Sequence, residues 1–315
     1  MKFMKKSLAL LFAVVLVFSL SAVAFADGDA SSVNIVKNYV STNGTTPAAS
    51  FTVEQVGNGK VTDGDATSAP ALGTITGVSY TAGETGTKNI VVNLPTYEKV
   101  GVYEYTLQEV AGTVAGVTYK TGTFVLKVQV TNAADGSLVR TPALYTDGAD
   151  ETKNDTIKNT YEGRDLSISK TVTGAYGDKT KYFTFKVTLT GDTDKTYPAT
   201  FAVSGGSYAS NPTTIALGTA TEFLLKDGDT ITIANLPVGV KYEVTETAVE
   251  GYTTAKTGDS GTITSGVDPT AAFTNDKDGT PETGISLDSL PYVVILVVVL
   301  GGAAVLFLRK RHAED

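Results

Sequence analysis

Residues 124–130 read Phe-Val-Leu-Lys-Val-Gln-Val, and residues 230–233 read Thr-Ile-Thr-Ile. Apolar residues fill every second position of both stretches, which is the period of a β-strand with one buried face. Glycine, asparagine and aspartate punctuate such runs, as at Asp135-Gly136, and these residues are typical of turns. No stretch between the two apolar ends of the chain shows a long 3.6-residue apolar period. The sequence therefore predicts an all-β protein, and its short, evenly spaced strands favour sandwiches.

The chain repeats itself once, and each copy opens with a strand that ends in lysine. The first copy begins Val-Asn-Ile-Val-Lys at residues 33–37, and the second begins Leu-Ser-Ile-Ser-Lys at residues 166–170. In both, two apolar residues two positions apart take inward positions and the lysine takes the next one, although the outward Val36 of the first copy is also apolar. We therefore expect Lys37 and Lys170 to point toward a core.

A tyrosine-rich strand follows a Leu-Pro pair in each copy and closes with glutamate. These strands are residues 103–109 (YEYTLQE) and residues 242–246 (YEVTE). Alternation places Glu109 on the face of the tyrosines and leucine, and it places Glu246 on the face of a tyrosine and a valine. Each apolar face therefore ends in a carboxylate.

Each copy ends on a strand whose inward positions hold an apolar residue and then an asparagine, Asn159 in the first copy and Asn275 in the second. A single Lys, Glu or Asn at a strand end more often sits at the rim in water. Six such residues, all at inward positions and in the same order in both copies, are much harder to obtain by accident. Burying an ammonium and a carboxylate is costly unless they are paired or neutralised, so the repeated arrangement favours a chemical role.

Composition excludes most classes of enzyme. The chain has no cysteine, and its one histidine, His312, lies in the C-terminal tail. Cysteine nucleophiles, Ser-His-Asp triads and histidine metal sites are therefore excluded from the part between the ends, and we expect no metal and no cofactor. The formal net charge of −8 makes nucleic acid an improbable partner.

The first 26 residues have the pattern of a secretory signal peptide. Three lysines fall within the first six residues, an apolar run covers Leu8–Leu20, and Ala24-Phe25-Ala26 has the small-x-small form of a cleavage site. The apolar run is short for a membrane span. We therefore expect cleavage after Ala26 and secretion.

The C-terminus contains a polar motif, an apolar run and a basic tail, in that order. The motif is Thr280-Pro281-Glu282-Thr283-Gly284, the run covers Tyr292–Leu308, and Arg309-Lys310-Arg311 follows it. The run is long enough to span a bilayer, and the basic tail places its far end in the cytoplasm. A single-pass protein that stays in the membrane is the alternative reading of this end.

This order resembles the sortase cell-wall sorting signal, which is Leu-Pro-x-Thr-Gly followed by a span and a basic tail. The match holds at Pro281, Thr283 and Gly284, whereas Thr280 replaces the leucine. The resemblance implies that a sortase thiol attacks the Thr283 carbonyl and that Gly284 leaves with the span. The protein would then be anchored to peptidoglycan on the surface of a Gram-positive-type bacterium.

The repeated Lys, Glu and Asn resemble the Cna B-type domains of streptococcal-type pilins and adhesins, which form a Lys–Asn isopeptide bond with a catalytic Glu. The resemblance spans essentially the whole chain. It implies two tandem immunoglobulin-like β-sandwich domains, 27–162 and 163–278, between the signal peptide, 1–26, and the transmembrane sorting segment, 279–315.

Carried over by position, the resemblance implies bonds from Lys37 to Asn159 and from Lys170 to Asn275, with Glu109 and Glu246 assisting. Apolar surroundings lower a lysine's pKa and raise a carboxyl's, so both groups can be neutral. The amine then attacks the amide carbon, protonated Glu donates to the amide oxygen, and ammonia leaves. The reaction occurs once per domain without turnover, so the protein is not expected to be an enzyme.

A structural subunit of a sortase-assembled pilus is the first functional hypothesis, with other pilin subunits as partners in a homopolymer. A monomeric wall-anchored adhesin or stalk that binds a host surface ligand is the second, and a surface enzyme is a distant third. The family's Tyr-Pro-Lys-Asn linkage motif is absent, since Tyr197-Pro198 precedes alanine. The resemblance implies that a lysine near the end of the first domain can serve instead. Lys153 fits this description, with Lys158 on the outward face of the last strand as the alternative. The first copy also has room for an extra strand pair or long loop between Ala111 and Thr152.

Overall fold

The structure is a computed structural model that describes residues 29–146, 153–279 and 295–296. Nearly all regular structure within these ranges is β, so the predicted all-β class is confirmed. The signal peptide and the motif at 280–284 lie outside them.

Over the same ranges no helix is long and apolar enough to cross a membrane. The predicted span at 292–308 falls outside them except for two residues.

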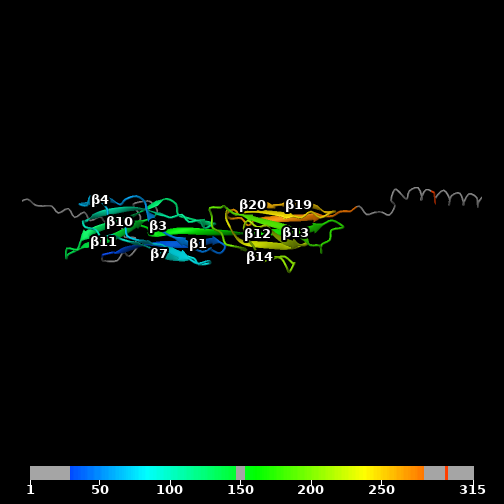
Figure 1. Ribbon diagram of the computed structural model, residues 1–315, viewed down its shortest axis with the longest axis horizontal. Coiled ribbons are helices and arrows are strands. Elements are labelled where there is room, and N and C mark those ends of the chain that lie inside the picture. The colour runs from blue at the N-terminus through cyan, green and yellow to red at the C-terminus, as the bar shows by residue number, and fades with distance from the viewer. Residues whose placement is uncertain (1–28, 147–152, 280–294, 297–315) are drawn as a thin grey trace, which may run out of the picture.

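Two hydrophobic cores lie one after the other along an elongated molecule (Figure 1). The first contains buried residues from Val33 to Tyr161, and the second contains buried residues from Leu166 to Phe273. We call the parts built around them the first and second domains. One strand of 18 residues, β12 (Thr156–Thr173), runs through both of them.

The first domain packs two sheets face to face. One sheet contains the first half of β12 with β1 (Ser32–Asn43), β5 (Ile75–Thr76), β7 (Gly86–Asn93) and β9 (Val117–Thr118). The other contains β3 (Val53–Gln55), β4 (Lys60–Gly64), β8 (Gly101–Glu109), β10 (Thr123–Asn132) and β11 (Leu138–Tyr145). A small pair, β2 (Ala49–Phe51) and β6 (Val78–Tyr80), completes the domain. The extra strand pair or long loop predicted between Ala111 and Thr152 is a longer β10 and one added strand, β11, because the second domain already has β20 where the first has β10.

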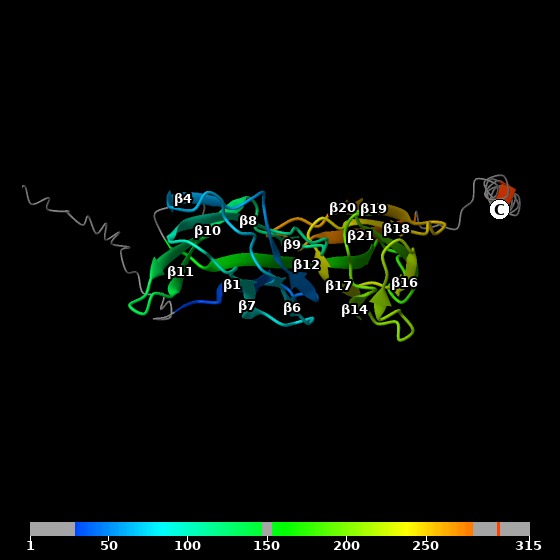
Figure 2. The same cartoon turned by 60° about the vertical axis from the view of Figure 1, so that its left-hand side comes forward.

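The second domain repeats this layering with different strands. One sheet contains the second half of β12 with β14 (Phe201–Gly205), β15 (Thr214–Ile215), β17 (Thr230–Pro237), β19 (Thr253–Thr257) and β21 (Thr270–Asp276). The facing sheet contains β13 (Phe183–Thr190), β16 (Thr221–Leu225), β18 (Lys241–Glu246) and β20 (Ser260–Thr262). Figure 2 shows β12 as the one strand that passes from one domain to the other.

Asn235 is one of the residues that connect the domains beside β12. Its amide group exchanges two hydrogen bonds with the backbone of Thr45, at 3.1 and 2.9 Å. It adopts a left-handed φ of 58°, a conformation that asparagine tolerates better than most residues. A side chain at Gly44 or Gly163 would collide with its Oδ1. The junction is therefore packed closely around this side chain.

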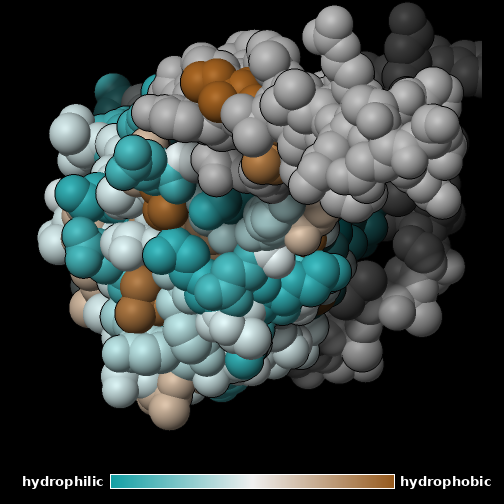
Figure 3. Space-filling model, turned by 90° about the vertical axis from the view of Figure 1, so that its right-hand side faces the viewer, coloured by the Kyte–Doolittle hydropathy of each residue, from teal (hydrophilic) through white to brown (hydrophobic). Residues whose placement is uncertain are grey.

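The end of the second domain that faces the viewer in Figure 3 is mostly hydrophilic where described residues are visible, with small separate apolar spots. Exposed large apolar side chains in this domain are few, among them Tyr176, Tyr208 and Val267. A scatter of this kind is ordinary for a soluble surface. Association through this end would therefore bury little apolar surface.

Candidate functional site

A buried cluster in the first domain joins three side chains that are far apart in the sequence. Lys37 lies on β1, Glu109 on β8 and Asn159 on β12. The Lys37 Nζ donates to Glu109 Oε1, and the Asn159 Nδ2 donates to the same oxygen at 2.9 Å. Lys37 and Asn159 are fully buried and Glu109 is 6% exposed. One carboxylate therefore holds the amine beside the amide.

The surroundings of Lys37 raise the fraction of its side chain that is neutral. Its Nζ lies 4.5 Å from the centre of the Phe51 ring, and that ring packs edge-on against Tyr39 and Tyr80. Burial lowers the pKa of Lys37 from 10.5 to about 8, although the hydrogen bond and charge of Glu109 act in the opposite direction. About one lysine in ten is then a neutral nucleophile at pH 7.

The second domain contains the same three residue types. The Lys170 Nζ on β12 donates to both carboxylate oxygens of Glu246 on β18, at 3.3 and 3.1 Å. Asn275 Nδ2 on β21 donates to Glu246 Oε1. Lys170 lies over the Phe183 ring at 4.3 Å, and burial lowers its pKa. All the residues predicted from the two sequence copies therefore come together, three in each domain.

The two clusters share one strand register. β1 runs parallel to β12 with Lys37 opposite Ile157, two residues before Asn159. β12 in turn runs parallel to β21 with Lys170 opposite Phe273, two residues before Asn275. Residues two apart share one face of a strand, so in each domain the lysine and the asparagine face the same core. The glutamate comes from the facing sheet and lies between them.

The contacts of the glutamates differ in one respect from the role given to them by the sequence resemblance. Glu109 and Glu246 hydrogen-bond the lysine amine and the asparagine Nδ2, not the amide oxygen. The carboxylate thus bridges the attacking nitrogen and the nitrogen that would leave as ammonia. This position suits transfer of a proton from the first nitrogen to the second.

Sequence reasoning missed the aromatic rings that line these clusters, Phe51 in the first domain and Phe183 in the second. Phe51 lies on the two-strand pair β2–β6, which is outside the strands that the sequence repeat identifies. The Tyr80 hydroxyl, which donates to the Lys37 carbonyl at 2.8 Å, was missed for the same reason. Across the described ranges no group of three or more side chains could hold a metal ion.

The two candidate linkage lysines lie at the start of β12. Lys158 is exposed on the outward face of the strand, and Lys153 is partly exposed just before it. β12 leads from there through the second domain to Thr173, and Thr173 pairs with Asp276 close to where the chain leaves that domain. The lysines and the departing chain are therefore at opposite ends of β12 (Figure 1).

Comparison with known proteins identifies the family. The chain is 31% identical to a pilin of Streptococcus pyogenes serotype M1, over 89% of this chain and 90% of that protein. The chain belongs to the pilin family. Residues 33–162 of this pilin match the model described as the Spy0128-like isopeptide containing domain. Residues 164–277 match a domain of unknown function.

Solved structures agree with this assignment. The crystal structure of the major pilin from Streptococcus pyogenes covers 80% of this pilin and 100% of its own chain, with 27% identity and a TM-score of 0.58. The pilus tip adhesin Cpa of Streptococcus pyogenes is 37% identical, but only over 39% of this pilin and 18% of the adhesin. The predicted likeness to a Gram-positive major pilin is confirmed, and the protein is a structural subunit of a cell-surface pilus.

Proposed function

We propose that each domain of this pilin closes itself with a Lys–Asn isopeptide bond, Lys37 to Asn159 and Lys170 to Asn275. The observation that carries the proposal is the strand register, which is the same in both domains. Each lysine is paired with the residue two positions before its asparagine on the neighbouring strand, and a buried carboxylate contacts both side chains. The folded chain supplies the proximity that the reaction needs. The protein acts on itself once and turns over no substrate.

The bonds would brace nearly the whole of each domain. Each joins the first strand of its domain to the last, so the loop that it closes holds most of the core. By analogy with a disulfide around a loop of about 100 residues, each bond would stabilise its domain by roughly 4–5 kcal/mol. The chain has no cysteine, so this brace takes the place that disulfides hold in other exported proteins.

The rate of the reaction should depend on pH. The pKa of Lys37 is about 8 in the fold, so the neutral amine dominates above pH 8 and falls about tenfold for each pH unit below it. Chain recovered unreacted in urea and refolded at pH 6, 7, 8 and 9 should form the first bond fastest at the highest values. Peptide masses taken over time measure this, and a rate that is the same at pH 6 and pH 8 would contradict the proposed nucleophile.

We also propose that a sortase joins Thr283 to a lysine of the next subunit or to peptidoglycan. The order of motif, apolar run and basic tail supports this, as does the polar end of the second domain, which has little apolar surface for non-covalent association. Relatives that are a pilin and a pilus tip adhesin support assembly with other pilin subunits. An adhesin that binds a host ligand alone is less favoured, because the match to the pilin covers 90% of that protein, whereas the match to the tip adhesin covers 18% of the adhesin.

The sorting proposal predicts that the mature chain ends at Thr283. Mass spectrometry of C-terminal peptides released from the wall should find Thr283 linked to an amine, because Gly284 is the leaving group. A Thr283→Ala variant should instead keep an intact peptide across residues 283–284. Recovery of that intact peptide from most wild-type molecules would rule the proposal out.

A further inference from the structure

A main-chain N–H group points into the first cluster and contacts the atom that would become negatively charged. The Lys120 amide donates to Glu109 Oε2 at 2.8 Å and to Asn159 Oδ1 at 3.1 Å. When an amine attacks an amide carbon, the charge develops on the amide oxygen. An oxyanion hole places a fixed donor about 2.7–3.1 Å from the position of the charged oxygen, and the Lys120 N–H lies 3.1 Å from the uncharged amide oxygen.

A local break in strand pairing turns this group inward. β9 is only two residues long and pairs Thr118 with Thr160 on β12. Continued pairing would place Tyr119 opposite Asn159 and keep the backbone in the ladder. The chain leaves the ladder instead, and the Tyr119 hydroxyl accepts a hydrogen bond from the Val114 amide at 3.3 Å.

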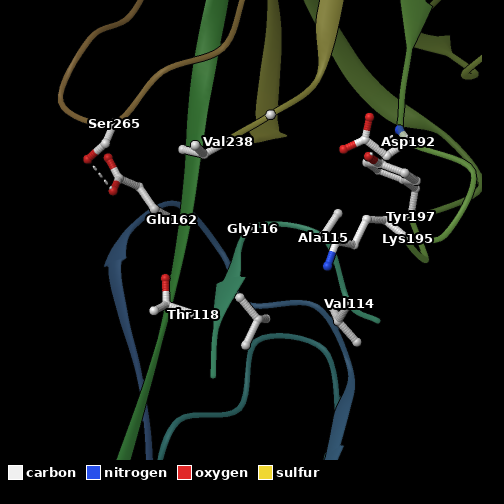
Figure 4. Close-up of a pocket in the computed structure, with 12 residues that line it drawn as sticks. Val114, Ala115, Gly116, Thr118, Glu162, Asp192, Lys195, Tyr197, Val238 and Ser265 are labelled. Carbon is white, nitrogen blue, oxygen red and sulfur yellow. Dashed lines mark hydrogen bonds between the residues drawn. The ribbon is translucent and has the colours of Figure 1, made fainter. Parts of the chain in front are cut away.

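Contacts with both domains hold the segment that leads to Lys120. Thr113 and Ala115 exchange backbone hydrogen bonds with Thr196 of the second domain, at 2.7 and 3.0 Å. The Gly116 carbonyl accepts a hydrogen bond from Glu162 on β12 at 3.0 Å. Figure 4 shows this segment beside β12, facing Tyr197 of the second domain across a cavity of about 330 Å³. The donor is therefore preorganised by tertiary contacts.

The second domain has no such donor. β19 continues along β21, with Thr254 opposite Asn275 and Ala255 opposite Thr274. Asn275 Oδ1 is buried and has no hydrogen-bond partner among the described residues. Buried polar atoms are rarely left without a partner, so the two clusters differ at the one atom where charge would develop.

From this difference we infer that the Lys120 main-chain N–H is an oxyanion donor for bond formation in the first domain, and that the second domain reacts without one. The inference rests on the proposed Lys–Asn reaction. In that reaction the Lys37 Nζ lone pair forms the bond to Asn159 Cγ, and the carbonyl electron pair moves to Oδ1 beside the Lys120 N–H. The carbonyl re-forms as the Cγ–Nδ2 bond breaks, and Glu109 transfers a proton from Nζ to Nδ2, which leaves as ammonia.

Refolding of the full mature chain, recovered unreacted in urea, tests the inference, with each branched peptide quantified by mass over time. Folding is followed by near-ultraviolet circular dichroism of the tyrosines, so that bond formation is timed from completed folding. The wild type should form the Lys37–Asn159 bond before the Lys170–Asn275 bond. Replacing the amide between Tyr119 and Lys120 with an ester puts an oxygen in place of the N–H and leaves every side chain unchanged. This should slow the first bond by roughly 100-fold or more.

Several controls make the result specific. The second bond in the same molecule is an internal reference and should keep its rate. Lys120→Ala retains the main-chain N–H and should react like the wild type, whereas Lys120→Pro, which removes the N–H by a second route, should react like the ester. The ester should slow the first bond at every pH, including the plateau above its pH midpoint, because the lost donor acts on Oδ1. Loss of the second hydrogen bond, to Glu109 Oε2, would by itself only move the midpoint.

Three results would overturn the inference and leave the proposed bonds intact. These are equal rates of the two bonds in the wild type, a wild-type rate in a folded ester variant, and an ester effect that consists only of a shifted pH midpoint through Glu109. Absence of both branched peptides from folded wild-type protein would instead contradict the Lys–Asn reaction itself.

Discussion

Glu109→Ala protein is expected to lack the bond in its first domain and to keep the bond in its second. Folded wild-type mature chain should weigh two ammonia molecules less than its sequence mass, and the variant should weigh one ammonia less. Glu246→Ala should show the reverse pattern of branched peptides. The reason is that each carboxylate contacts both nitrogens of its own cluster and neither nitrogen of the other.

The same variants should lose stability in one domain only. Loss of the brace should cost on the order of 4 kcal/mol, which lowers the melting temperature of a domain of this size by roughly 10–20 °C. The cavity and the buried, unpaired Lys37 that Glu109→Ala leaves would add to this loss. Calorimetry combined with intact mass would measure both effects on one sample.

Two controls separate the bond from packing. Glu109→Gln keeps the volume of the side chain but cannot carry the proton, so it should also remain unbonded. Glu98→Ala removes an exposed carboxylate from the same domain and should form both bonds with little change in stability. Full-sequence mass in well-folded wild-type protein would show that the bonds do not form.

Lys153→Arg is expected to abolish covalent polymers while the protein is still secreted and anchored. Lysine can supply a neutral amine to an acyl-enzyme, whereas the arginine guanidinium stays protonated and is not a nucleophile. The substitution keeps the positive charge, so local electrostatics should change little. A blot of wall extracts should then show one band in place of a high-mass ladder.

Lys158→Arg is the matched control, since Lys158 lies five residues further along the chain, on β12, and is more exposed. It should leave the ladder unchanged. A ladder that persists in Lys153→Arg and disappears in Lys158→Arg would move the linkage to Lys158. Wild-type extracts without any ladder would contradict sortase polymerisation and support the anchored-adhesin hypothesis.

Linkage at Lys153 would give the two bonds different mechanical roles. Force would enter at Lys153, pass along β12 to Lys170 and cross the second bond to Asn275, close to where the chain leaves the domain. Most of the first domain precedes Lys153 in the chain and would lie off this path. The second bond would then carry load, and the first would stabilise its domain against unfolding and proteolysis.

The sequence alone determined the strand character, the repeat and the inward direction of the six reactive side chains. These properties depend on the period of two, which is local to each strand and can be read from adjacent residues. Lys37 and Asn275 could therefore be assigned to core faces without knowledge of their neighbours. The added segment between Ala111 and Thr152 was predictable because the first copy is longer than the second between its glutamate and its asparagine, but its form, one further strand, was not.

Only the tertiary structure decided how the strands align and what surrounds the reactive atoms. The alignment of Lys37 with Ile157 joins residues far apart in the chain, and a shift of one position would turn the partner to the other face. The Phe51 ring and the Lys120 N–H reach the cluster through a small strand pair and a broken ladder. Every residue except proline has such an N–H, so no residue type marks the one that turns inward. The segment that leads to it is held by contacts with Thr196 in the other domain, which no local pattern contains.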